Sequence, residues 1–287
     1  MKKWCAMLWM LLFLTACGGQ SSEITLPEPP VLEQPPRLTA ETSAGLVQVR
    51  YGTASWTVTD ETGQATGFEA DAVHPLDEQA VLPVLQPGDG TVTLVFDGTA
   101  PGKIDVRCWD IEQRGNVEAV PELFAVEGSS FPLKEGSYIY EVRGWWSEDV
   151  RYGGSAFYVF AVRDLGITLA AEQVTEEGLT LACTQSGGNP TGELNTGSWY
   201  ELQRMGEKGW EQVPYSDQLP ADADVAWTAE AWFIPLEDTV QWDITLDYLY
   251  GKLQPGTYRI LKEIMDFRGP GDFDKGICYA VFTIPET

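Results

Sequence analysis

The residue with the most specific chemistry in this sequence is Cys17, which ends the segment Leu14-Thr15-Ala16-Cys17. Small residues before a cysteine form a lipobox, in which the thiol takes a diacylglyceryl group before cleavage makes that cysteine the new N-terminus. Two lysines precede the uncharged run that leads to Cys17, and this run is shorter than the roughly 20 residues of a membrane-spanning helix. We therefore expect residues 1–16 to be a lipoprotein signal peptide and Cys17 to carry a lipid (palmitate-type) anchor, because two acyl chains hold a protein stably on a bilayer.

The chain has one histidine, His74, with Asp71 and Asp77 on either side of it. Such a group could orient an imidazole as a general base, but Pro75 favours extended backbone at His74, so we expect a turn there. The sequence holds no H-E-x-x-H zinc motif and no C-x-x-C pair, and no Ser-x-x-Lys nucleophile follows the signal. It therefore predicts no catalytic residue, no metal site of these types and no cofactor, and we expect that the protein is not an enzyme.

Three carboxylates, Asp266, Asp272 and Asp274, lie in a glycine-rich segment near the C-terminus. Calcium binds such oxygens, so a weak calcium site is an alternative to a plain hairpin loop, although the spacing is not that of an EF-hand and Arg268 and Lys275 offset the charge. The 43 acidic residues also leave open a carboxylate pair that hydrolyses glycan.

Adjacent tryptophans, Trp145 and Trp146, stand near the end of a predicted strand. Neighbouring strand residues point to opposite faces, so one tryptophan is expected in the core and the other at a surface. Together with Tyr152 and the glycines at 153 and 154, they form the predicted binding surface, suited to stacking on a sugar or docking a peptide. Packing within the domain is the alternative.

The composition is strongly acidic, with 18 Lys and Arg against 43 Asp and Glu and a net charge of −25. This excludes nucleic acid as a partner, because phosphate contacts need clustered basic side chains. A neutral glycan, a cationic peptide or a basic protein surface are the partners that the charge favours.

The cysteines do not form a disulfide framework, because Cys108, Cys183 and Cys278 are all that remain after the signal and Cys17 are set aside. They are expected to be small buried hydrophobes, while a pair between Cys183 and Cys278 stays open.

Residues 17–36 are rich in proline and predict an extended tether. Beyond it, apolar runs with the period of strands predict an all-β fold with no long helix. The predicted strands are LVQVRYG, TASWTVTD, TVTLVFDG, KIDVRCWD, SYIYEVRGWW, SAFYVFAV, GITLAAEQV, GLTLACTQ, SWYELQRM, TVQWDITL, TYRILKEIM and ICYAVFTI. The segments DEQAVLPVLQ and DYLYGKL contain Pro83 and Gly251, so each supports at most one helical turn.

A short motif, Leu-x-x-Gly-x-Tyr, occurs twice, with Gly136 and Tyr138 in the first copy and Gly256 and Tyr258 in the second. In Ig-like sandwiches a tyrosine at the start of the penultimate strand bonds to backbone a few residues upstream, and a preceding glycine permits the turn. The repeat predicts two tandem sandwiches of this kind, at residues 37–164 and 165–287.

The second half also resembles a known family. The residues Tyr200, Leu202, Arg204, Gly209 and Trp210, followed by the corner at Leu249–Ile260, are similar to the bacterial immunoglobulin-like domain of Firmicutes surface lipoproteins and of extracellular tails of penicillin-sensing metallopeptidase receptors. The first half is similar to a β module that often accompanies this domain. The resemblance implies an extracellular region and brings no catalytic motif.

These observations together predict a non-catalytic lipoprotein at the cell membrane, anchored on its extracellular face, that presents Ig-like domains for binding or envelope sensing. A glycan hydrolase of the cell wall and a passive surface spacer are the alternatives.

The anchor can be tested with Cys17→Ser, which removes the thiol that would be lipidated. We expect the variant to leave the membrane fraction for the medium or to remain as unprocessed precursor. Continued labelling of the variant by a palmitate analogue would overturn the assignment.

Overall fold

The computed structural model describes residues 31–147, 151–217, 219 and 225–286. Residues 31–287 form one compact unit. The predicted signal peptide, Cys17 and most of the predicted tether lie outside the described residues. Among those described, no helix is long and apolar enough to cross a membrane.

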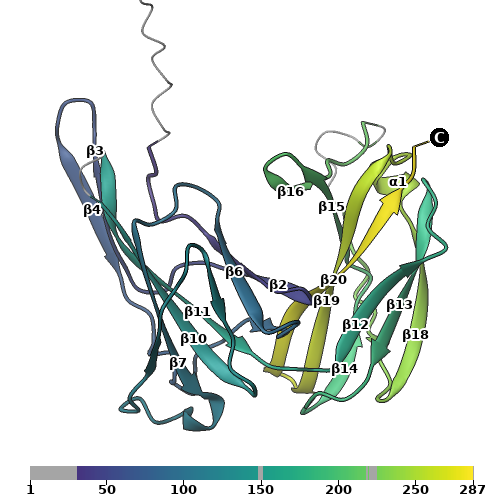
Figure 1. Ribbon diagram of the computed structural model, residues 1–287, viewed down its shortest axis with the longest axis horizontal. Helices are drawn as coiled ribbons and strands as arrows, with labels where there is room; N and C mark the ends of the chain where they lie inside the picture. The colour runs from purple at the N-terminus through teal and green to yellow at the C-terminus, as the bar shows by residue number, and fades with distance from the viewer. Residues whose placement is uncertain (1–30, 148–150, 218, 220–224, 287) are drawn as a thin grey trace, which may run out of the picture. The chain divides into compact units, whose positions relative to one another are not determined.

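The chain folds almost entirely into antiparallel β-structure, as predicted, and every predicted strand is present (Figure 1). Sheet A runs in the order β16 (Gly209–Gln212), β15 (Glu201–Gly206), β19 (Gly256–Gly269), β20 (Asp272–Ile284), β2 (Gly45–Val49), β1 (Leu38–Glu41), β6 (Thr91–Phe96) and β9 (Ser130–Pro132), with β14 (Glu193–Thr196) on β19 and β17 (Trp232–Phe233) on β14.

Two further sheets pack against sheet A. Sheet B runs in the order β4 (Ala65–Ala70), β3 (Ala54–Thr59), β11 (Tyr152–Val162), β10 (Tyr138–Trp146), β7 (Lys103–Asp110) and β8 (Glu122–Phe124), with β5 (Val84–Leu85) beside β11. Sheet C consists of β12 (Ile167–Glu172), β13 (Gly178–Gln185) and β18 (Asp238–Thr245). The helical content is a 3₁₀ turn, η1 (Ile111–Gln113), and one turn of α-helix, α1 (Asp247–Tyr250), which ends at Gly251.

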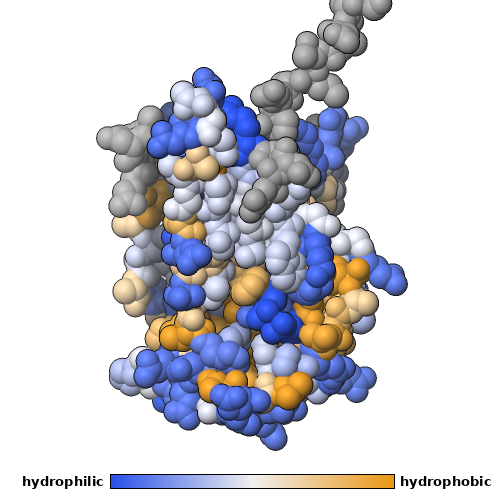
Figure 2. Space-filling model, turned by 90° about the vertical axis from the view of Figure 1, so that its left-hand side faces the viewer, coloured by the Kyte–Doolittle hydropathy of each residue, from blue (hydrophilic) through white to orange (hydrophobic). Residues whose placement is uncertain are grey.

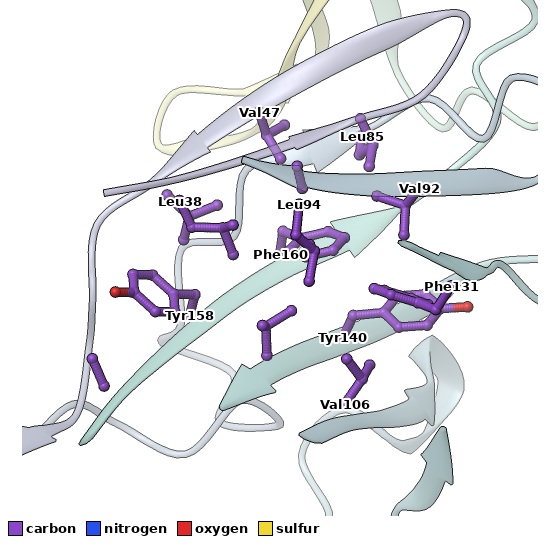
Figure 3. Packing of buried hydrophobic residues seen from close by; sticks show 14 of the residues in the cluster. Leu38, Val47, Leu85, Val92, Leu94, Val106, Phe131, Tyr140, Tyr158 and Phe160 are labelled. Atoms are coloured by element: carbon purple, nitrogen blue, oxygen red, sulfur yellow. The ribbon is translucent and has the colours of Figure 1, made fainter. Parts of the chain in front are cut away.

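The first half is a sandwich of sheet B on strands β1, β2 and β6. Alternate residues of β10 and β11 point inward, so that Phe160 lies beside Leu94 and Tyr158 beside Leu38 between the sheets (Figure 3). The outer face of sheet B is covered at one end by the 3₁₀ turn and the loop around Leu76, which pack on Trp109. At its other end, Ser55 and Glu69 of this face are exposed.

The second half is a sandwich of sheet C on β15, β19 and β20. Leu181 and Ile244 of sheet C pack against Ile260 and Phe282 of sheet A, in a cluster that includes the α1 residue Leu249. Figure 1 shows β12, β13 and β18 lying beside one another in front of this part of the chain.

Sheet A is continuous through both halves because β2 pairs with β20, with Gly45 opposite Cys278 and Leu46 opposite Ile277. A Cβ on Gly45 would lie 2.4 Å from the carbonyl oxygen of Ile277, so only glycine permits this approach. The two halves of the chain therefore have separate cores that share one sheet.

Arg259 joins the halves beside this pairing. It is 3 % exposed, and its guanidinium forms an ion pair with Glu41 of the first half and bonds to Gln203 at 2.7 Å. The guanidinium carbon lies 4.8 Å from the ring of Tyr279, whose hydroxyl donates to the carbonyl of Thr42 at 2.6 Å.

The folded part begins earlier than residue 37, the start expected from the sequence. Val31 and Leu32 pack against the core of the first sandwich, and the Leu32 carbonyl accepts from the indole of Trp56 at 3.0 Å. The Pro36 carbonyl accepts from the hydroxyl of Tyr158 at 2.7 Å. The end of the proline-rich segment is therefore part of the fold.

Tyr258 has the contact expected of a tyrosine corner. Its hydroxyl donates to the backbone carbonyl of Gln254 at 2.7 Å, and its ring stacks on Phe282 with 5.7 Å between centroids. Gly256 opens the strand, and a Cβ there would lie 2.8 Å from Nε of Arg204.

In the first sandwich the equivalent position belongs to Tyr140, and its assignment to Tyr138 is wrong. Tyr140 stacks on Phe160 at 5.8 Å, and its hydroxyl accepts from the backbone N–H of Lys134 at 2.9 Å. Tyr138 is half-buried, with its ring 4.7 Å from the Lys134 ammonium. Gly136, the glycine of the first copy of the motif, lies in a turn as predicted, with φ of +110°. Tyr138 and Tyr140 lie on the same face of the strand, because side chains at i and i+2 share a face. The stacking on Phe160 makes Tyr140 the corner residue.

The corner can be tested with Tyr258→Phe, which removes only the hydroxyl. We expect a loss of about 1 to 3 kcal/mol in the free energy of unfolding, nearer the lower value because water can reach the exposed Gln254. Chemical denaturation of the variant and of Tyr248→Phe, a control at a 72 % exposed position, would measure it. Equal stability of all three proteins would show that the bond contributes nothing.

Candidate functional site

Two residues of the predicted binding surface, Trp146 and Tyr152, are buried in the first core, and that part of the prediction is wrong. Trp146 is 6 % exposed and meets Trp56 edge-on at 5.3 Å, while its indole N–H donates to the Thr99 carbonyl at 2.7 Å. Tyr152 is 5 % exposed, stacks on Trp56 and donates to Oγ1 of Thr99 at 2.8 Å. The indole N–H and the tyrosine hydroxyl both form hydrogen bonds within the fold, so neither residue is available to a ligand.

Trp145 lies on the opposite, outer face of sheet B, as the alternation along β10 requires. It is half-buried, with the ammonium of Lys103 4.6 Å from its ring centroid and the ring of Phe157 edge-on at 6.1 Å. Lys103 is exposed, and an exposed ion pair such as its contact with Asp105 contributes little to stability. A ligand can therefore displace the lysine from the indole.

The register of sheet B places a row of polar residues beside Trp145. Directly paired positions on successive strands are Lys103, Trp145, Ser155, Ser55 and Glu69. The row combines an aromatic ring, two hydroxyls and one charge of each sign on an open sheet.

The next row along the strands pairs Asp105, Arg143 and Phe157. The guanidinium of Arg143 lies 4.3 Å from the Phe157 ring and bonds to Glu141 at 2.6 Å. We refer to Lys103, Arg143, Trp145, Ser155 and Phe157, with Ser55 and Glu69, as the aromatic face. The sequence analysis did not predict Phe157, Lys103 and Arg143 as site residues. The alternation in SAFYVFAV could have indicated that Phe157 points away from the core.

The aromatic face has the groups that bind a neutral polar ligand. Aromatic rings stack on the C–H faces of sugars or on planar groups, and hydroxyls and charged side chains give hydrogen bonds at the rim. Among the residues that define the face, no nucleophile is paired with a base.

Arginine side chains pair with the acidic cluster of Asp266, Asp272 and Asp274, for which the sequence left a weak calcium site open. Asp266 is fully buried and accepts from the backbone N–H groups of Thr191 and Gly192 at 3.0 and 2.6 Å. Asp274 is paired with both Arg163 and Arg268, and Asp272 with Arg268. The carboxylates are therefore saturated by guanidinium and backbone donors, and the described residues contain no cluster suited to a metal ion.

His74 has a structural role in the turn that precedes Leu76. Its Nδ1 accepts from the Leu76 N–H at 3.1 Å, and its ring meets Trp109 edge-on at 5.7 Å. This nitrogen is therefore engaged with the backbone of the turn.

The cysteines of the described residues, Cys108, Cys183 and Cys278, are buried free thiols. Burial raises the pKa of Cys108 to about 11 and of Cys183 to about 12. Cys183 and Cys278 pack in the same cluster without forming a disulfide. At neutral pH these thiols are protonated and unreactive.

One unpredicted ionisable group, Lys262, lies inside the second sandwich. Its ammonium donates to the carbonyls of Gly197 and Trp199 and lies 4.5 Å from the ring of Trp232. Burial lowers its pKa to about 8. The carbonyls and the ring replace the water that a charged lysine normally keeps.

Residues 163–275 match the model of the bacterial Ig-like domain family. The match begins close to the predicted start of the second domain and confirms that this half is Ig-like. The surface lipoproteins and receptor tails named in the resemblance stay a prediction. No curated protein sequence matches the chain significantly.

The two tryptophans can be distinguished by alanine variants. Trp146→Ala should lower the free energy of unfolding by about 3 to 5 kcal/mol, because it leaves a large cavity between the sheets. Trp145→Ala should cost only about 1 kcal/mol, because its ring is partly in water. Denaturant melts of both variants would show this order, and a reversal would mean that β10 has the opposite register.

Proposed function

We propose that this protein is a non-catalytic, lipid-anchored binding protein on the extracellular face of the cell membrane. The observation that carries the proposal is the match of residues 163–275 to the bacterial Ig-like domain, a family that is generally non-catalytic. The all-β fold of the described chain supports it, because sandwiches of this kind present loops and sheet faces to partners.

The lipobox at Cys17 supports the anchor, and the proline-rich segment after it supports a short spacer between the lipid and the fold. The net charge of −25 favours a position away from anionic lipid headgroups. A role beside an envelope sensor fits the receptor tails that carry similar domains.

The ligand that best fits the aromatic face is a neutral glycan. Trp145 and Phe157 offer flat apolar surface, and the serines at 55 and 155 offer hydroxyls directly beside it. A cationic peptide fits less well, because Lys103 and Arg143 already lie against the rings.

Binding without hydrolysis is favoured by the contacts of the buried carboxylates. A glycosidase uses a pair of carboxyl groups that flank the bond it cleaves. Among the described residues the buried carboxylates are Glu141 and Asp266, and each forms ion pairs with arginine. These contacts favour a structural role for both carboxylates.

The proposal can be tested by co-sedimentation. The mature chain carrying Cys17→Ser would be mixed with insoluble neutral polysaccharide and, separately, with purified cell wall. We expect saturable binding without release of reducing sugar, and a loss of at least tenfold in affinity for Trp145→Ala, since a central aromatic contact is typically worth about 2 kcal/mol. The matched control is Tyr248→Ala, which removes an aromatic ring at a 72 % exposed position of the second sandwich. Undiminished binding by Trp145→Ala would move the site elsewhere, and released sugar would overturn the non-catalytic role.

A further inference from the structure

A cavity of about 460 Å³ opens between the end of β2, the loop at residues 72–83 and the β19–β20 hairpin. Its walls include Val73, Val81, Val159 and Phe273, with the basic residues Arg50 and Lys275. The volume is that of a site for a small organic molecule.

The mouth of the cavity exposes hydrocarbon to water. Val81 is 90 % exposed, Val73 is 53 % exposed and the Phe273 ring is 39 % exposed. A ligand with an alkyl chain would remove the exposed surface of Val73, Val81 and Phe273 from water, which is favourable in proportion to the area covered. Exposed hydrophobic side chains also occur in the lower part of the side of the molecule seen in Figure 2, below a band of weakly polar surface.

The charge of the lining is opposite to that of the protein. Arg50 and Lys275 line the cavity and no Asp or Glu does, although the chain carries 43 acids and a net charge of −25. Lys275 bonds to Glu263 at 2.7 Å, just outside the lining. The Arg50 guanidinium makes no hydrogen bond or ion pair with any described residue. An unneutralised cation beside an apolar wall is complementary to an anion that carries a hydrocarbon chain.

The overall negative charge does not exclude such a ligand. At physiological ionic strength the Debye length is about 8 Å, so carboxylates beyond this distance are largely screened. Asp272 and Asp274, which flank Phe273 in the chain, are paired with Arg268 and Arg163. The total charge predicts neutral or basic partners for the surface as a whole, and the lining of this cavity is a local exception.

We propose that the cavity binds a free alkyl carboxylate, with its chain against Val73, Val81 and Phe273 and its carboxylate on Arg50. This site is separate from the aromatic face and does not depend on the glycan assignment. A carboxylate suits the planar guanidinium, which can donate two parallel hydrogen bonds to it.

The test is isothermal titration of the mature chain, with Cys17→Ser so that no acyl chain is attached, using decanoate below its micellar concentration. We expect saturable binding of decanoate, no binding of acetate, which lacks the chain, and at least tenfold weaker binding of decyltrimethylammonium. No saturable binding of decanoate, or equal binding of the cationic amphiphile, would overturn the proposal.

Two variants with matched controls locate the site. Val81→Asp and Arg50→Gln should each weaken decanoate binding at least tenfold, while Val120→Asp, at an 85 % exposed valine outside the cavity, and Lys208→Gln should not. All four positions are exposed, so the variants should fold, which a thermal melt would verify. Equal effects of Val81→Asp and Val120→Asp would overturn the site. Trp145→Ala should leave decanoate binding unchanged, which separates this test from that of the glycan.

Discussion

The structure depends on one short backbone pairing, in which Gly45 of β2 faces Cys278 of β20. This pairing makes sheet A continuous, so that each half of the chain builds its own core on a shared layer. The approach leaves no space for a Cβ at Gly45. A larger residue there would separate β2 from β20, and the contacts between the halves would lose their geometry.

The charges buried near this pairing are stable only because the two halves are held in register. Arg259 lies between Glu41 and the ring of Tyr279, and Arg163 lies between Asp266 and Asp274. An ion removed from water is costly unless its partner is well placed. Separation of the halves would take Arg259 from Glu41 and Arg163 from Asp274, so these ion pairs favour one relative arrangement of the halves.

The two surfaces that we propose as binding sites lie away from both cores. The aromatic face uses the outward residues of β7, β10 and β11, whose inward neighbours form the first core. The cavity at Arg50 uses a loop of the first half and the hairpin tip of the second, and it exists only because β2 and β20 bring these segments together. A sandwich of this kind supplies a rigid frame, and its ligands are determined by what the frame leaves exposed.

The sequence by itself determined the strands, the all-β class and the corner at Tyr258, because alternation and turn residues act over a few positions. It determined that Trp145 and Trp146 face opposite ways, but not which of them is buried, because that depends on which face of sheet B meets sheet A. It also placed the first corner at Tyr138, where the stacking against β11 selects Tyr140. Only the tertiary structure decided the pairing of β2 with β20, the place of Arg163 in the acidic cluster, the lysine within the second core and the cavity at Arg50. Each of these joins residues far apart in the chain, and local patterns carry no information about such contacts.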